Sequence, residues 1–313
     1  MEGLLFIGLY KIINDLVLDI KLNTLIFAKK PLILHLFMKL VKVFSGLILL
    51  SFLLFSCSKY SKIEKSKDVE YKLLKADEYY GKKKYRLAQQ LYESLFPVYK
   101  GTQKFEDLYY KYAYCFYYQG LYSDAENLFK GYLEVFPTSS RAEEVDYMRA
   151  YCYYKRSPKL ELEQVNTVKS MNMMQSFINT HPGSPKNKEA SEIIDKSRAK
   201  LEQKEFRSAQ LYYNLEKYRA AAITFTNLLN KYPESIKGEE YKLMVIKSYY
   251  RFAKMSYIDK QIERYEKVID EYEDFAERYP DSKLLKDAEE YNNLSKTQIK
   301  EIQNEQNSSS VKR

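Results

Sequence analysis

The chain has 313 residues, of which 51 are Lys or Arg and 42 are Asp or Glu, for a formal net charge of +9. The two signs are interspersed and no basic block dominates, which is typical of solvated helix faces and argues against a nucleic-acid partner. Two histidines, three cysteines and no tryptophan leave few groups for metal binding or nucleophilic catalysis. We therefore expect no metal, no cofactor and no enzymatic activity.

The first 37 residues do not fit an export signal. Acidic and basic side chains interrupt every apolar run in this segment before it reaches the roughly 20 residues that a membrane span requires. We interpret residues 1–37 as an upstream extension and expect translation to begin at Met38.

Residues 38–56 have the pattern of a signal peptide. Two lysines supply a basic start, and the thirteen residues from Val43 to Phe55 carry no charge yet are too few to cross a bilayer. The run ends in Leu-Phe-Ser-Cys at Cys57, which resembles the bacterial lipobox, although Phe55 is bulkier than the small residue usual there. We expect cleavage before Cys57 and lipid attachment to its thiol. The alternative is a short buried segment with an incidental cysteine.

Four short phrases recur along the rest of the chain at spacings of 45, 51 and 47 residues. They are Phe136-Pro137-Thr138-Ser139, His181-Pro182-Gly183-Ser184, Tyr232-Pro233-Glu234-Ser235 and Tyr279-Pro280-Asp281-Ser282. Proline cannot continue a helix, and the serine two places on can cap the next one. Each phrase therefore predicts a helix stop followed by a helix start.

The segments between these phrases have helical periodicity and fit a 34-residue frame that resembles the tetratricopeptide repeat. We predict an all-α solenoid of about five helix-turn-helix units. Units three and five exceed the frame by about eight residues, so we expect a longer link between their two helices. The predicted parts are a lipidated tether at 57–67, units one to three at 68–186, units four and five at 187–302 and a disordered tail at 303–313. We expect one rigid unit, or two halves hinged near Asn187.

The remaining candidate reactive residues have structural explanations. Cys115 and Cys152 occupy matching places in neighbouring repeats, where helix axes about 8–10 Å apart favour two buried thiols over a disulfide, the minority alternative in an oxidising compartment. His181 takes the place of an aromatic residue in a closing phrase, so packing at a turn explains it.

Tyrosine is the unusual residue of this chain, with 32 copies. The repeat frame places many of them at the concave, ligand-facing positions of the first helices, where their large faces and hydroxyls would suit a binding groove. The predicted groove residues are Tyr80, Tyr110, Tyr114, Tyr117, Tyr118, Tyr147, Tyr151 and Tyr154, with Lys111 or Lys155 available to a terminal carboxylate. We expect these rings to face solvent; the alternative is that they pack between helices.

A lipidated chain of five tetratricopeptide units with such closing phrases resembles the BamD family, the lipoproteins of the outer-membrane β-barrel assembly machinery. The resemblance spans the mature chain and implies an outer-membrane, lipid-anchored protein that faces the periplasm. It also implies that the amino-terminal units receive unfolded outer-membrane β-barrel proteins through a terminal aromatic signal. The carboxy-terminal units would dock on the periplasmic domains of the barrel-forming subunit.

Two other functions fit the same architecture. A glycan-uptake lipoprotein would be expected to be longer and to stack sugars on tryptophan, which this chain lacks. An adaptor for cell-wall enzymes remains open.

Overall fold

The computed structural model describes residues 39–42, 44 and 60–311, and within them every regular element is a helix. The helices follow one another in packed pairs, which confirms the predicted all-α fold of the tetratricopeptide type. The chain divides into two compact units between Phe105 and Glu106, and each unit is described by itself. Cys57, the upstream extension and most of the predicted signal peptide lie outside the described residues.

The first unit is built on one pair of helices. α3 (Val69–Gly81) packs against α4 (Tyr85–Tyr99) after a short turn. Ala76 and Ala88 are fully buried, one on each helix. Their small side chains allow the two helices to approach closely, as the repeat frame requires.

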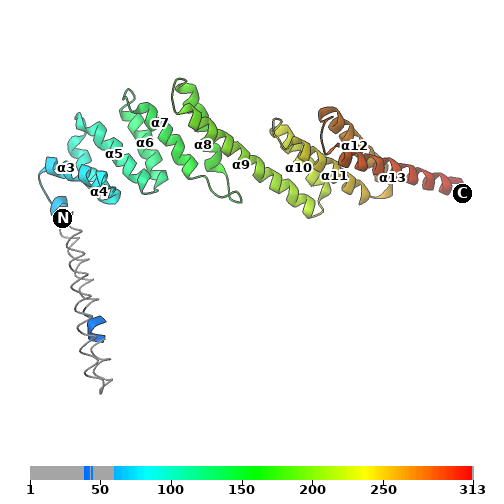
Figure 1. Cartoon of the computed structure of the whole chain (residues 1–313), viewed down its shortest axis with the longest axis horizontal. Coiled ribbons are helices and arrows are strands. Elements are labelled where there is room, and N and C mark those ends of the chain that lie inside the picture. Colours follow the sequence, from blue (N-terminus) through cyan, green and yellow to red (C-terminus); the bar gives the residue numbers. More distant parts are fainter. Residues whose placement is uncertain (1–38, 43, 45–59, 312–313) are drawn as a thin grey trace, which may run out of the picture. The chain divides into compact units, whose positions relative to one another are not determined.

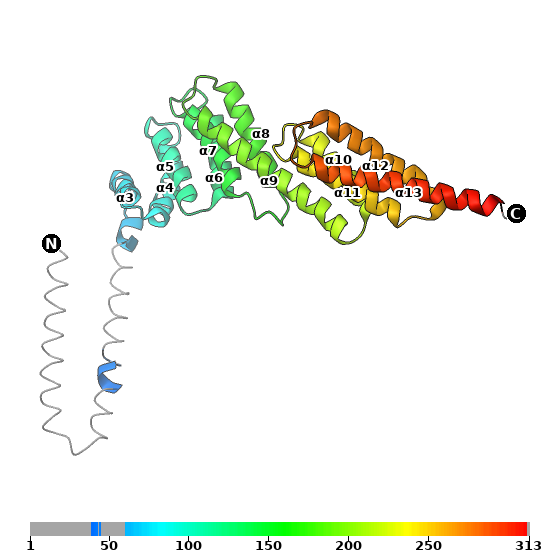
Figure 2. The same cartoon turned by 45° about the vertical axis from the view of Figure 1, so that its right-hand side comes forward.

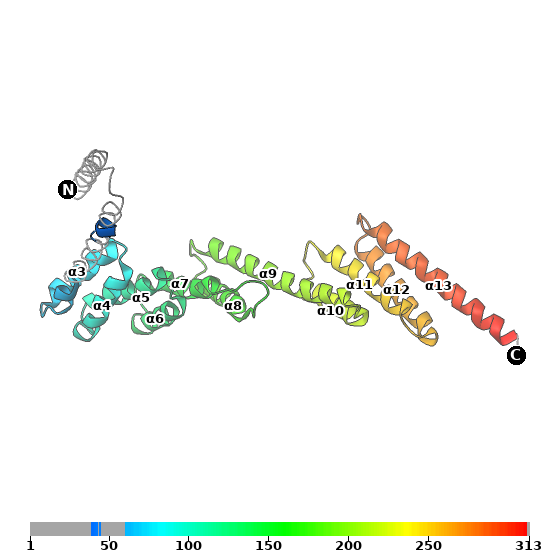
Figure 3. The same cartoon turned by 90° about the horizontal axis from the view of Figure 1, so that it is seen from below.

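The second unit holds the remaining helices. They are α5 (Lys104–Tyr118), α6 (Tyr122–Val135), α7 (Ala142–Lys155), α8 (Val165–Thr180), α9 (Asn187–Asn214), α10 (Tyr218–Lys231), α11 (Gly238–Lys254), α12 (Ile258–Arg278) and α13 (Leu285–Val311), except that the boundary assigns the first two residues of α5 to the first unit. From α6 onward each helix packs against the next along the chain, as Figures 1 and 2 show. α9 packs against both α8 and α10, so this one helix belongs to two neighbouring pairs (Figure 3).

The core of this unit repeats with the helices. One phenylalanine at a matching place on each second helix is at most 1% exposed, and the four are Phe129, Phe177, Phe225 and Phe275. Each second helix therefore buries one aromatic anchor. No helix in the described part of the chain combines the length and the apolar character that a membrane span needs.

The closing phrases end the helices as predicted. Phe136, His181, Tyr232 and Tyr279 each follow the last helical residue, with φ between −126° and −132° and ψ between 56° and 63°. The proline that follows excludes the α conformation from the residue before it. The same local sequence therefore produces the same backbone turn four times.

The serine of each closing phrase makes the same pair of hydrogen bonds. Its hydroxyl accepts from the backbone N–H two residues on, at 3.0–3.2 Å, and donates to a glutamate on the preceding first helix. We call this arrangement the serine–glutamate clamp; its pairs are Ser139 with Glu106, Ser184 with Glu143, Ser235 with Glu202 and Ser282 with Glu239. The clamps thus join α5 to α7, α7 to α9, α9 to α11 and α11 to α13.

The extra residues of the third and fifth repeats, units three and five of the sequence analysis, adopt different structures. In unit three, residues 156–164 form the predicted longer link between α7 and α8. In unit five the prediction is wrong, because only residues 255–257 separate α11 from α12 and the extra residues lengthen the helices. The link in unit three contains Pro158, whereas the corresponding stretch of unit five has neither proline nor glycine to stop a helix.

Two further expectations differ from the structure. The division into units lies at Phe105 and not near Asn187, where α9 begins and packs without interruption into the second unit. The segment expected to be a disordered tail is helical through Val311, and residues 60–64 of the predicted tether form a helical turn that buries Ile63.

Acid should weaken the first clamp. Hydrogen bonds from Ser139 and Tyr132 hold the pKa of Glu106 below its ordinary value. Because the folded-state pKa is lowered, this stabilisation is complete above the unfolded-state pKa of about 4.3 and is lost as the pH falls through the folded-state value. We expect Glu106→Gln to flatten the fall in Tm between about pH 5 and pH 2, followed by circular dichroism.

Two serine variants complete that measurement. Ser139→Ala removes the donor that lowers the Glu106 pKa, so it should flatten the profile as well. Ser140→Ala, at the exposed neighbouring position, is the matched control and should keep the wild-type slope. Identical slopes in all four proteins would contradict the assignment.

Candidate functional site

Seven of the eight predicted groove tyrosines lie in one continuous set of ring contacts on α5 and α7. Neighbouring ring centroids are 4.7–6.4 Å apart, and the Tyr117–Tyr151 contact joins the two helices. We call this set the tyrosine stripe; its members are Tyr110, Tyr114, Tyr117, Tyr118, Tyr147, Tyr151 and Tyr154. The repeat frame therefore grouped side chains that do contact one another, although more than 20 residues separate their two helices in the chain.

The eighth tyrosine, Tyr80, belongs to the first unit. It lies on α3 and is half-buried. Its ring contacts those of Tyr85 at 5.7 Å and Tyr92 at 6.5 Å, both on α4. These contacts lie within the α3–α4 pair.

The depth of the stripe differs from the expectation that its rings face solvent. Tyr114 is 5% exposed and Tyr147 is 2% exposed, so for these two the expectation is wrong. Tyr147 packs against Phe177 at 5.5 Å, within the cluster that α7, α8 and α9 share. Tyr118 is 49% exposed, and the other four members are half-buried. The stripe thus has a buried floor, formed by Tyr114 and Tyr147, and a partly exposed rim, formed by its other five members.

A carboxylate from the next repeat accepts hydrogen bonds from two phenols of the stripe. Glu144 Oε1 accepts hydrogen bonds from the hydroxyls of Tyr110 at 2.9 Å and Tyr114 at 2.6 Å. Burial, assisted by Glu144, raises the pKa of Tyr114, and it raises that of Tyr110 to about 12. Both phenols are therefore neutral at physiological pH.

Cations line one side of the stripe. The Arg141 guanidinium lies 4.4 Å from the centroid of the Tyr110 ring and pairs with Asp107 at 2.9 Å. Lys186 lies 5.0 Å from the Tyr147 ring, at the matching place one repeat later. Both cations come from the turns that follow the closing phrases.

The two lysines predicted to meet a ligand carboxylate are engaged elsewhere. Lys111 pairs with Asp107 at 2.6 Å. Lys155 lies over the ring of Tyr122 at 5.7 Å. Neither is therefore directed at the stripe.

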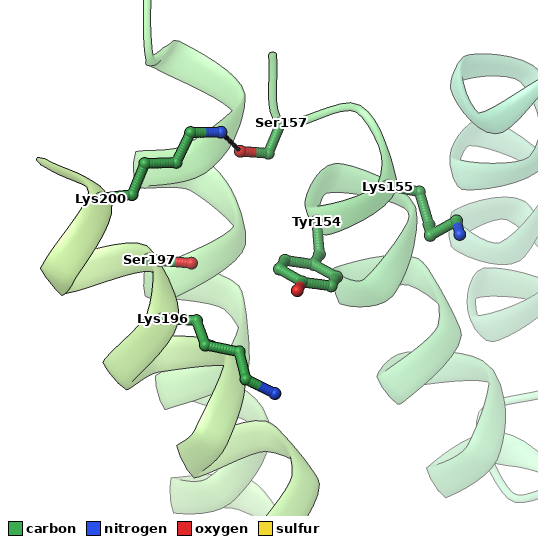
Figure 4. A pocket seen from close by; sticks show the side chains of 6 residues that line it. All are labelled: Tyr154, Lys155, Ser157, Lys196, Ser197 and Lys200. Carbon is green, nitrogen blue, oxygen red and sulfur yellow. Dashed lines mark hydrogen bonds between the residues drawn. The ribbon is translucent and has the colours of Figure 1, made fainter. Parts of the chain in front are cut away.

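A pocket that the sequence did not predict lies where the stripe ends. It has a volume of about 330 Å³ and is lined by Tyr154, Lys155, Ser157, Lys196, Ser197 and Lys200 (Figure 4). Lys196, Ser197 and Lys200 come from α9, and in the sequence they are part of a long charged helical stretch. The spacing of Lys196 and Lys200, four residues apart, places them on one helix face, but nothing in the sequence indicates what that face meets.

The other candidate residues have structural roles. Cys115 and Cys152 are free and fully buried, and burial raises the pKa of each thiol to about 12. His181 follows the end of α8, with its ring 4.9 Å from Phe177 and its Nε2 3.4 Å from Asp146. Across the described residues no group of three or more His, Cys, Asp or Glu side chains could hold a metal ion.

The burial of Tyr114 can be tested directly. Tyr114→Ala should destabilise the protein by about 3–5 kcal/mol, because it removes a buried ring and leaves a cavity. Tyr118→Ala removes a ring with half of its surface exposed and should change stability by about 0.5 kcal/mol or less. Chemical denaturation measures both. Equal destabilisation by the two variants would contradict this division of the stripe.

The chain was compared with known families, curated proteins and solved structures. The sequence profile of a family described as YfiO, outer membrane lipoprotein, matches residues 65–263. No curated protein matches the chain. Among solved structures, the TPR2AB domain of yeast Sti1 in its pHSP90 complex matches with a TM-score of 0.35 and 10% identity, over 73% of this chain and 98% of that one. Because the family profile covers more than half of the sequence, this protein belongs to the YfiO, or BamD, family of outer membrane lipoproteins.

Proposed function

We propose that this protein is a non-catalytic, lipid-anchored component of the machinery that assembles β-barrel proteins in the outer membrane. In this role it binds unfolded barrel proteins and docks on the barrel-forming subunit. Membership of the family supports the membrane context. The observation that carries the binding role is the continuous tyrosine stripe, whose rim is open while its floor is fixed.

The stripe has the chemistry that an extended peptide needs. Its half-buried phenols offer flat apolar faces to side chains, and they are held by ring contacts, so little conformational entropy is lost on binding. Hydroxyl groups at the rim can donate to backbone carbonyls of a bound segment. The site would therefore favour peptides with aromatic side chains and would not require a long specific sequence.

Docking on the barrel-forming subunit is assigned to the carboxy-terminal units. Three large apolar side chains within four consecutive residues are exposed in the turn between α11 and α12 and at the start of α12. Met255 is 63% exposed, Tyr257 is 87% exposed and Ile258 is 54% exposed. Exposed apolar groups gathered in this way are typical of protein interfaces, and the periplasmic domains of the barrel-forming subunit are the proposed partner.

Peptide binding tests the proposal. Tyr118→Ala combined with Tyr151→Ala removes two rim rings and should weaken binding of a carboxy-terminal peptide of a β-barrel protein by at least tenfold, about 1.4 kcal/mol. Titration calorimetry gives the Kd, and circular dichroism checks that helicity is kept. Tyr257→Ala, an exposed tyrosine in the α11–α12 turn, is the matched control and should bind normally. Wild-type affinity in the double variant would refute the binding role.

Lipid anchoring at Cys57 is a separate prediction from the sequence. Two or more acyl chains hold a protein stably on a membrane, since each buried methylene contributes about 0.8 kcal/mol. Mass spectrometry of the membrane-bound protein should find an acylated Cys57 as the first residue. Cys57→Ala should leave the precursor uncleaved and without acyl mass. A mature terminus at another residue would rule out this anchor.

A further inference from the structure

The pocket at the end of the tyrosine stripe is built by two helices. Tyr154 and Ser157 line it from the end of α7 and the link that follows, while Lys196, Ser197 and Lys200 line it from α9. Figure 4 shows the three α9 side chains projecting toward α7, with the Tyr154 ring opposite them. The Lys155 side chain leads away, toward Tyr122. No acidic side chain lines this pocket.

Lys200 brings a cation without a matching anion. Its Nζ donates to Ser157 Oγ at 2.8 Å and to the Pro158 carbonyl. Among the described residues, no carboxylate lies within ion-pair distance of it. Burial lowers the Lys200 pKa, as expected for an ammonium group that has lost water and gained no negative charge. A bound anion would remove this electrostatic cost.

Lys196 adds a second positive charge one helical turn away. Its one ion pair in the described chain is with Glu192, on the same helix, at 3.7 Å and largely exposed. Surface pairs of this kind are weak and exchange readily. Lys196 can therefore turn to a ligand in the pocket at little cost.

Ser197 is a polar group that lacks a partner. It is 2% exposed, and its hydroxyl has no hydrogen-bond partner in the described part of the structure. Other helical serines of this chain, such as Ser248 and Ser295, donate to the carbonyl four residues earlier. A buried hydroxyl that makes no hydrogen bond lowers the stability of the fold unless a ligand or a water bonds to it. Its place between the two lysines fits an oxygen ligand.

The pocket continues the stripe. Tyr154 lines the pocket, and its ring lies 5.6 Å from that of Tyr151 on the stripe. A ligand that follows the stripe to this end thus passes from aromatic faces to a cationic recess. We propose that this pocket binds the terminal α-carboxylate of a peptide whose last side chains rest on the tyrosine stripe, with Lys196 and Lys200 as the charged contacts. The assignment rests on the function proposed above, and it deepens that function by naming the chemical group that marks the end of the substrate.

A purely structural role explains only part of the site. The basic face of α9 holds the 156–164 link, since Lys204 donates to the Leu162 carbonyl at 2.7 Å and Arg207 pairs with Glu161. Lys200 shares in this role through Pro158. Lys196 pairs with Glu192 of its own helix and the hydroxyl of Ser197 makes no hydrogen bond, so this role explains neither of them.

The test compares two forms of one peptide, a β-barrel carboxy-terminal sequence with a free acid or with an amide at its end. The purified full-length protein in detergent should bind the acid at least tenfold more tightly than the amide. In Lys196→Gln with Lys200→Gln, the two forms should bind within twofold of each other. Lys204→Gln, on the same helix face but outside the pocket, is the control and should keep the preference for the acid. Lys196→Gln alone should reduce that preference and covers the case in which the double variant does not fold.

The outcomes separate the two proposals. Equal binding of acid and amide by the wild type would overturn the carboxylate site and leave the peptide-binding function intact. Binding of neither form would refute both. The Tyr118→Ala and Tyr151→Ala double variant should weaken both forms by the same factor and retain the preference for the acid. A preference that survives removal of both lysines would also overturn the assignment.

Discussion

The serine–glutamate clamp is the interaction on which the second unit depends. A single hydroxyl satisfies a backbone N–H at the start of one helix and reaches a carboxylate on the first helix of the preceding repeat. Because an ionised acceptor makes a stronger and shorter hydrogen bond, each clamp fixes the register of two helices that are not consecutive in the chain. On α5 and α7 the stripe begins one turn beyond the clamp, at Tyr110 and Tyr147. The clamp between α5 and α7 and the ring contact of Tyr117 with Tyr151 therefore both hold the two halves of the stripe together.

The helix boundaries could be predicted because the signals that set them are local. A proline and a serine at fixed places decide where one helix stops and the next begins, and no distant contact is needed. The length of a link is a weaker signal. Unit five shows this, since its additional residues could extend either the turn or the helices, and without proline or glycine they extend the helices. The glutamates of the clamps could not be recognised, because a carboxylate in a helix is also typical of a solvated face. Three of them lie in a first helical turn and Glu202 lies in the middle of α9.

The depth of a side chain was harder to predict than its direction. Periodicity places Tyr114 and Tyr118 on α5, yet one is buried and the other is half exposed. The ring of Tyr114 packs against that of Phe129 on α6 at 5.2 Å, and its hydroxyl donates to Glu144 of the next repeat. The pocket likewise depends on residues that are far apart in the sequence. Tyr154 and Lys200 are 46 residues apart in the sequence, and only the packing of α9 beside the end of α7 brings them to one site.

α9 has a mechanical consequence for the unit as a whole. Its 28 residues, at 1.5 Å each, form a rod about 42 Å long, which carries Lys196 and Lys200 in its first half and packs against α10 with its second half. Where most repeat proteins have a turn between neighbouring pairs, this chain has unbroken helix, and a helix resists bending far more than a turn does. A tilt of α9 at the pocket would therefore be transmitted along the helix to its contact with α10. A ligand held by Lys196 and Lys200 would thus contact the same continuous helix that packs against α10.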